Sequence, residues 1–221
     1  MEDEKQTPFN PYKSIWLSPR PTIQFIVDTN PTYLVLVLAA LVGVYGGLSS
    51  ASAEGWGYNL SAFWLFIGIV MIVPFISIIG LYLGAALTRW TGKWLGGSAT
   101  QQQIRAAYAW SYIPMIAAMV LYIPLLMIYG FDLFAFSGNV ILPEADPMVP
   151  RQVGPLIIFV AIVETVLCVW SFIVSLHCLG QVQGFSAWRA LGNQILASLV
   201  LIIPLALILA ALVAIFVSHA Y

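Results

Sequence analysis

One carboxyl group stands out in this 221-residue sequence, because Glu164 lies near the middle of a long apolar run. An ionised side chain at that depth in a membrane costs about 3 kcal/mol unless it is paired, so such a residue marks a functional contact by default. Small and polar side chains continue the same face of a helix with about 3.6 residues per turn. They are Cys168, Ser171, Ser175 and Cys178.

This intramembrane polar stripe, Glu164 to Cys178, admits two interpretations. It can line a path on which the carboxylate contacts protons or cations, or a protonated Glu164 can hydrogen-bond to a neighbouring helix at a closely packed interface. The second interpretation is favoured, because a pathway usually contains more than one intramembrane charge. Tyr122 lies at a comparable depth in another apolar run and is the candidate partner.

The sequence lacks the residue patterns of metal sites, hydrolytic active sites and phosphate-binding loops. His177 follows Glu164 by 13 residues, nearly on the opposite helix face, so the two cannot share a metal ion on one helix. HExxH, CxxC and GxSxG motifs and glycine-rich phosphate loops are absent from the sequence. Cys168 and Cys178 are about 15 Å apart along a helix, beyond the reach of a disulfide. We therefore expect a non-enzymatic protein with no metal, no cofactor and no nucleic-acid partner.

The composition indicates an integral membrane protein. Hydrophobic residues make up 61% of the chain and charged residues 8%, against roughly 25% charged residues in a soluble domain. Five apolar runs have about the 20 residues that a transmembrane helix needs, so we expect an all-α protein with five spans in the lipid bilayer. The runs lie near 31–48, 60–88, 104–130, 154–179 and 192–217.

The chain before the first span divides into two parts. Residues 1–9 are polar and are expected to form a disordered tail. Residues 10–30 mix hydrophobic with polar side chains, and Pro19 and Pro21 split them into two short helices. We expect an amphipathic segment that lies in the headgroup layer, and a loop packed on the bundle is the alternative. The first span is expected to be retained, although Ala51-Ser52-Ala53 after it has the form of a cleavage site.

Basic residues are distributed unequally over the connections between the spans. Seven of the 8 Lys and Arg fall on the side that holds the N-terminus when the connections are assigned to alternate sides. The positive-inside rule then predicts a cytoplasmic N-terminus and an external C-terminus. We expect a multi-pass protein of the plasma membrane. Five of the 8 tryptophans fall on the cytoplasmic boundary, namely Trp16, Trp90, Trp94, Trp110 and Trp188.

The turn between the second and third spans has clear helix-stop and helix-start signals. Gly96 and Gly97 end the preceding helix, and Thr100 with a glutamine three residues later has the spacing of a capping box. A similar turn, Gly184-Phe185-Ser186, precedes the last span. The likeness is either a weak internal repeat or a chance resemblance, and a parallel duplication would place the two turns side by side.

Glycine pairs and prolines mark places where the spans pack or bend. Gly43 with Gly47 and Gly80 with Gly84 have the spacing that lets two helices approach closely. We expect these glycine pairs to pack helices against each other within the bundle, and contact between copies in a homo-oligomer is the alternative. Prolines interrupt the helical hydrogen bonds inside three spans. They are Pro74, Pro114, Pro124 and Pro204.

Four segments carry a family resemblance. They are Asn10-Pro11-x-Lys13-x-Ile15-Trp16-x-x-Pro19-Arg20-x-Thr22-Ile23, Gly96-Gly97-x-x-Thr100, Tyr112-x-Pro114 and Gln183-Gly184-Phe185-Ser186-x-x-Arg189-Ala190. In order and placement they resemble bacterial members of the Yip (Ypt-interacting protein) family over nearly the whole chain. Eukaryotic relatives are Golgi and endoplasmic reticulum proteins associated with Rab GTPases and vesicle traffic. The chain lacks the Asp-Leu-Tyr-Gly-Pro element of those relatives, so Rab binding is not carried over.

The leading hypothesis is a polytopic membrane protein with a role in membrane organisation or traffic that engages a partner protein or anionic lipid at its cytoplasmic face. The alternative is a small carrier or channel with Glu164 as its proton or ion site, and a third possibility is a stabilising subunit of a larger complex. The residues expected at the cytoplasmic face are Lys13, Trp16, Arg20, Arg89, Lys93, Arg105 and Arg189, with the motif residues Gly96, Gly97, Tyr112, Pro114, Gly184 and Phe185.

Overall fold

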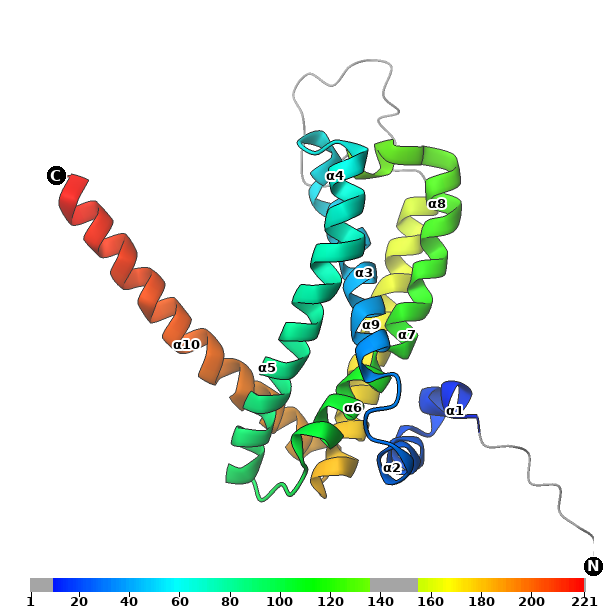
Figure 1. The fold of residues 1–221 in the computed structure, drawn as a ribbon, viewed down its shortest axis with the longest axis vertical. Coiled ribbons are helices and arrows are strands. Elements are labelled where there is room, and N and C mark those ends of the chain that lie inside the picture. The colour runs from blue at the N-terminus through cyan, green and yellow to red at the C-terminus, as the bar shows by residue number, and fades with distance from the viewer. Residues whose placement is uncertain (1–9, 136–154, 221) are drawn as a thin grey trace, which may run out of the picture.

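The described chain is helical throughout, with long helices side by side and two short N-terminal helices against one end of them (Figure 1). The computed structural model describes residues 10–135 and 155–220, so the tail expected at 1–9 lies outside the described residues. The α-helices are α1 Pro11–Leu17, α2 Pro19–Thr29, α3 Val35–Glu54, α4 Ala62–Ile67, α5 Val73–Trp94, α6 Gln101–Ser111, α7 Ile113–Ala117, α8 Tyr122–Tyr129, α9 Pro155–Gln183 and α10 Ala187–Ala220. Short helical stretches, η1 Trp56–Tyr58, η2 Gly68–Ile72, η3 Ala118–Leu121 and η4 Gly130–Phe134, connect or extend them.

Five helical segments in the described ranges are long and apolar enough to cross a membrane, which confirms the predicted fold class. They run over Val35–Glu54, Ala62–Trp94, Gln101–Phe134, Leu156–Gln183 and Ala187–Val213. The helix of the first span, α3, begins at Val35 and not at residue 31, because the chain forms a turn after Asn30. The Asn30 side-chain oxygen accepts hydrogen bonds from the backbone N–H and the hydroxyl of Thr32, at 3.0 and 2.8 Å.

Prolines interrupt the second and third spans. In the second span, the π-helical stretch η2 directly precedes α5, whose first turn contains Pro74. A proline ring removes one donor and displaces the carbonyl four residues earlier, so the hydrogen-bond register shifts locally. In the third span, α6 ends at Ser111, and the N–H of Met115 donates to the Ser171 hydroxyl of α9 at 3.1 Å. A neighbouring helix thus satisfies a backbone group near Pro114.

The N-terminal helices are packed into the side of the bundle. Helix α2 packs against α9 and α6, and α1 against α7, so that Ile15 and Ile23 are fully buried. The indole N–H of Trp170 in α9 donates to the carbonyl of Trp16 at 3.2 Å. One face of both short helices therefore belongs to the protein core.

The helices α5 and α9 end with the same backbone geometry. A glycine with left-handed φ follows each of them, Gly96 at 83° and Gly184 at 78°. The next residue donates its N–H to the carbonyl five residues earlier, in the pattern of a Schellman motif. These bonds join Gly97 to Gly92 at 2.8 Å and Phe185 to Gly180 at 2.9 Å. After the first turn, α6 begins with the predicted capping box between Thr100 and Gln103.

The last helix separates from the rest of the bundle. Helix α10 starts in contact with α9 and α5 and then diverges from them (Figure 1). Every residue from Leu201 to Val213 is exposed, and the segment is the most apolar of the five. This surface is suited to contact with hydrocarbon.

Helices α3 and α5 approach each other closely at Gly43. A Cβ atom at Gly43 would lie 2.7 Å from the Cα of Pro74 and 2.8 Å from the Cβ of Ser77, so only glycine fits. At the same crossing, the Ser77 hydroxyl donates to the carbonyl of Ala39 at 2.9 Å. The glycine pair that begins at Gly43 therefore serves packing inside the bundle.

We expect Gly43→Ala to lower the free energy of unfolding by about 1–3 kcal/mol, because the added methyl group overlaps the α5 backbone. Gly46→Ala is the matched control in the same helix, since a Cβ there meets nothing within 4 Å. That change should stabilise the protein by about 0.5–1 kcal/mol through helix propensity. Thermal unfolding in detergent micelles measures both, and equal melting temperatures would contradict the close crossing.

Candidate functional site

The predicted basic side chains of the described chain gather at one end of the molecule, where α1, α2, the α5–α6 turn and the α9–α10 turn lie (Figure 1). Lys13, Lys93 and Arg189 are exposed. Arg20 is half-buried, and its Nε donates to Nδ1 of His177 at 3.5 Å. The Arg105 guanidinium lies 4.2 Å above the centre of a tyrosine ring, that of Tyr82. Of these five side chains at the basic end, three are exposed to solvent and two contact other groups of the protein.

Large aromatic side chains accompany the cations at the basic end. Trp90, Trp94 and Trp188 are 52%, 57% and 81% exposed, and the rings of Trp90 and Trp94 lie 5.1 Å apart. Arg89 precedes the first of these tryptophans, and its Nε is buried with no hydrogen-bond partner among the described residues. Exposed indole rings beside cations are typical of a membrane–water boundary.

A buried polar network joins the two turns at this end. The Thr91 hydroxyl donates to the Asn193 side-chain oxygen at 2.6 Å, and the Asn193 amide donates to the carbonyl of Thr88 at 3.1 Å. The side chain of Gln183 lies so close to Gly92 that a Cβ there would overlap it. Asn193, Thr91, Thr88 and Gln183 are each less than 3% exposed. We call these four residues the turn network.

The backbone of the two turns is also in contact. The N–H of Ser98 donates to the carbonyl of Gln183 at 3.4 Å, and the Gln183 side chain would overlap a Cβ at Gly97. The turns therefore lie side by side, as a parallel duplication would require. Asn193 was not among the residues predicted from the sequence, where the only indication was a polar residue close to a glycine-containing turn.

An aromatic cluster ties the N-terminal segment to α6. The indole of the fully buried Trp110 donates to the carbonyl of Tyr33 at 3.2 Å, and its ring lies 5.4 Å from that of Tyr12. The hydroxyls of Tyr12 and Tyr33 are 3.3 Å apart. This hydrogen bond, together with burial, raises the pKa of Tyr12 above its ordinary value. The hydroxyl therefore stays protonated, and the bond persists, throughout the physiological pH range.

The structure divides the intramembrane polar stripe into three parts. Glu164 is half-buried beside the hydroxyls of Tyr122 and Tyr45, and its Oε1 is buried without a hydrogen-bond partner in the described chain. At the other end of the stripe, the sulfur of the buried Cys178 lies 3.8 Å from the carbonyl of Pro19 in α2.

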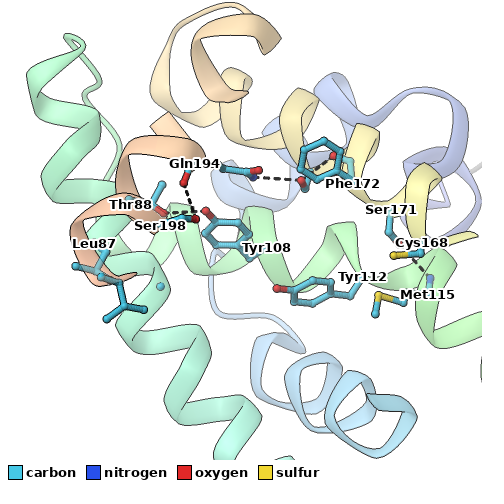
Figure 2. A pocket seen from close by; sticks show the side chains of 14 residues that line it. Leu87, Thr88, Tyr108, Tyr112, Met115, Cys168, Ser171, Phe172, Gln194 and Ser198 are labelled. Carbon is cyan, nitrogen blue, oxygen red and sulfur yellow. Dashed lines mark hydrogen bonds between the residues drawn. The ribbon is translucent and has the colours of Figure 1, made fainter. Parts of the chain in front are cut away.

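The middle of the stripe lines a cavity of about 380 Å³ between α5, α6, α7, α9 and α10 (Figure 2). Its hydroxyl and amide groups form a chain of contacts along the wall. The Gln194 amide donates to the Ser175 hydroxyl at 3.2 Å, and the hydroxyls of Thr88 and Tyr108 are 2.8 Å apart. The stripe residues in the lining are Cys168, Ser171 and Ser175, joined by the motif residue Tyr112. Glu164 is not part of the lining, and Pro114 is buried at the start of α7.

The chain was compared with known proteins. A family model described as the Yip1 domain matches residues 13–217. No curated protein and no solved structure matches the chain. The family match covers both turns, the basic end and all five membrane-spanning segments.

We expect Asn193→Ala to lower the free energy of unfolding by about 1–3 kcal/mol. The Thr91 hydroxyl loses its 2.6 Å acceptor and keeps only backbone carbonyls of its own helix, and the Thr88 carbonyl loses a donor in a buried site. Gln102→Ala is the control, since Gln102 is exposed on the neighbouring helix and its loss should change stability by less than about 0.5 kcal/mol. Chemical unfolding in detergent compares the two. A cost for Asn193→Ala no larger than the control's would show that the turn network does not hold the turns together.

Proposed function

Because the chain belongs to the Yip1-domain family, whose members are non-enzymatic, trafficking-related membrane proteins, we propose that its basic end binds anionic lipid headgroups. In this function the protein organises the membrane around it and catalyses no reaction. We further propose a bacterial-type member in the plasma membrane, with the N-terminus in the cytoplasm and the C-terminus outside. The unequal distribution of Lys and Arg along the sequence supports this orientation.

The observation that carries the lipid proposal is the joint exposure of cations and tryptophans at one end of the bundle. Lys93 and Arg189 are exposed beside Trp94 and Trp188, one pair in each helical hairpin. A basic residue near an anionic bilayer surface contributes about 1 kcal/mol, and an indole ring prefers the headgroup level. Cations and indole rings on adjacent turns therefore act on the same layer of lipid.

The N-terminal helices extend this surface. The side chains of α1 and α2 that face away from the core include the exposed Lys13 and Leu17, the latter 84% exposed. We propose that this segment lies at the headgroup layer with Leu17 in contact with acyl chains. Its buried face keeps it on the bundle, so that Lys13 has a fixed position relative to the turns.

A partner protein at the same end is the second ligand class compatible with this surface. Unpaired basic side chains and exposed indoles also suit a protein with an acidic surface. The lipid surface is preferred because it is always present at this depth, whereas a protein partner needs a complementary shape. The exposed faces of the spans are also compatible with a homo-oligomer or with a place in a larger complex.

The buried Oε1 of Glu164 favours a second candidate function, a carrier with this carboxyl as its proton or ion site. Such a carrier needs a polar path that reaches the carboxyl. The cavity next to α9 ends at Cys168, one helical turn from Glu164, and its lining does not include the carboxyl. Two tyrosine hydroxyls beside Glu164 instead suit a structural contact between α3, α8 and α9.

Replacing Lys13, Lys93 and Arg189 together by glutamine should reduce the preference for anionic lipid by up to about 3 kcal/mol in total. The measurement is the immobilised fraction of spin-labelled phosphatidylglycerol relative to phosphatidylcholine around the reconstituted protein. Added salt should reduce the wild-type preference as well. Glu54→Gln removes a charge at the last residue of α3, away from the basic end, and is the control. An unchanged preference in the triple variant would exclude the anionic-lipid function.

Glu164→Gln should leave the free energy of unfolding within about 1 kcal/mol of wild type, because an uncharged amide of the same shape can still bond the tyrosine hydroxyls. Proteoliposomes with a pH-sensitive dye inside test the carrier function in parallel. We expect no proton or potassium flux above that of empty liposomes for either protein. A wild-type flux that Glu164→Gln abolishes would establish the carrier instead.

A further inference from the structure

The cavity beside α9 has a lining that is mostly apolar and includes several uncharged polar groups. Its polar side chains supply hydroxyl groups, one amide and one thiol, and no Asp, Glu, Lys, Arg or His takes part. An ion inside it would be removed from water without a counter-charge, at a cost of several kcal/mol. The lining therefore suits a ligand whose polar part is uncharged and both donates and accepts hydrogen bonds.

Two hydroxyl groups in the wall retain hydrogen-bonding capacity. The hydroxyl of Tyr112 points into the cavity and bonds to nothing in the described chain (Figure 2). Ser171 accepts the N–H of Met115, and within the described residues its own proton has no acceptor. In contrast, Ser175 is saturated, because it donates to the carbonyl of Phe172 at 2.7 Å and accepts from Gln194. The two unsaturated hydroxyls come from different parts of the cavity wall, Tyr112 from the junction of α6 and α7 and Ser171 from α9.

The cavity lies below the level at which lipid phosphates sit. Along α9, Ser175 is about 12 Å and Cys168 about 22 Å from the end of the helix at Gln183, at 1.5 Å per residue. The exposed tryptophans and cations of the basic end mark the headgroup level near that helix end. A polar group in the cavity is therefore inside the hydrocarbon region, where lipids with small uncharged heads place their hydroxyls more readily than phospholipids place their phosphates.

The cavity is open toward the lipid on the side of α5 and α10. A Cβ at Gly84 or Gly80 of α5 would meet nothing within 4 Å, and Leu201 of α10, also in the lining, is 55% exposed. Beyond the cavity α10 diverges from α5, and apolar side chains such as Ile76 and Leu205 are 60% and 63% exposed (Figure 1). A hydrocarbon chain that leaves the cavity along this opening would contact apolar side chains throughout.

From these observations we propose that the cavity binds a membrane lipid with an uncharged, hydroxyl-bearing head, of which diacylglycerol is the simplest example. The head lies in the cavity, where its hydroxyl and ester oxygens exchange hydrogen bonds with the hydroxyls of Tyr112 and Ser171. Its acyl chains extend between α5 and the diverging α10. The volume of about 380 Å³ is within the range of about 300–1,000 Å³ typical of ligand sites and accommodates a glycerol group with the first carbons of its chains.

This site is separate from the basic end, and its ligand differs in charge. The basic end attracts anionic phosphates at the surface, whereas the cavity excludes them by desolvation and admits hydroxyls at depth. Loss of the cations should therefore leave cavity binding intact, and filling the cavity should leave the preference for anionic lipid intact.

The test uses the full chain in phosphatidylcholine nanodiscs that contain diacylglycerol with a photoreactive diazirine near its head. Illumination followed by peptide mass spectrometry should place labels on the peptides that contain Tyr112, Ser171 and Cys168. Gly84→Leu fills the open space inside the cavity and should lower this labelling about tenfold, a change of about 1.4 kcal/mol in binding. Tyr112→Phe removes one hydrogen bond but keeps the ring, and should lower it about threefold to tenfold.

Matched controls separate cavity binding from general contact with lipid. Gly68→Leu adds the same side chain at another open glycine outside the cavity and should leave the labelling unchanged. Phosphatidylglycerol with the same diazirine should label these peptides at least about tenfold less. Labelling spread evenly over all lipid-facing helices, or unaffected by both Gly84→Leu and Tyr112→Phe, would overturn the proposal.

Discussion

Inside the hydrocarbon core, each polar group of this chain depends on another protein group for its hydrogen bond, because lipid tails offer none. Asn193 meets this requirement at the end where the hairpins turn, by bonding Thr91 and the carbonyl of Thr88 in a site that is fully buried. Helix α10 is thereby fixed to α5. The arrangement of the basic end follows from that attachment, since these two helices carry Lys93, Arg189, the exposed tryptophans and part of the cavity wall.

The same requirement explains why helix interruptions and partner side chains occur together. Near Pro114 the N–H of Met115 is bonded by Ser171, a residue from another hairpin. Ser171 thus supports the third span and also lines the cavity, so the fold and the proposed lipid site share a residue. Gly43 shows the complementary case, because the absence of a side chain at this position lets α3 approach α5 closely at Pro74.

The sequence was sufficient for the features that depend on local chemistry. Length and hydropathy predicted five spans, and the capping box at Thr100 and the glycine that ends α5 were readable from residue types alone. The helical period also placed the polar stripe on one face of α9. Hydropathy does not distinguish a helix face in contact with protein from one in contact with lipid, however, so the division of that stripe among three environments was not predictable.

Contacts between distant segments were the part that the sequence could not supply. Residues 10–30 have an amphipathic pattern, but the pattern does not reveal that Ile15 and Ile23 pack on the bundle instead of facing lipid. Asn193 was equally inconspicuous, because an isolated polar residue near a span end is expected at the water boundary. Its burial follows from the glycines of the opposite turn, which bring the two hairpins together.

The polar groups of the described bundle are ordered by depth according to the cost of removing them from water. Cations lie at the basic end, where water still solvates them, and hydroxyl groups occupy the layer beneath it. Glu164 lies deeper, beside two tyrosine hydroxyls. The carboxyl group needs no cation as a partner when it carries a proton or accepts a hydrogen bond from one of these tyrosines. Taken together, the two proposed sites would select lipids by the depth of their polar groups, with anionic phosphates bound at the surface and neutral hydroxyls bound inside. The proposed role in membrane organisation would then rest on the depth of these polar groups and would need no catalytic residue.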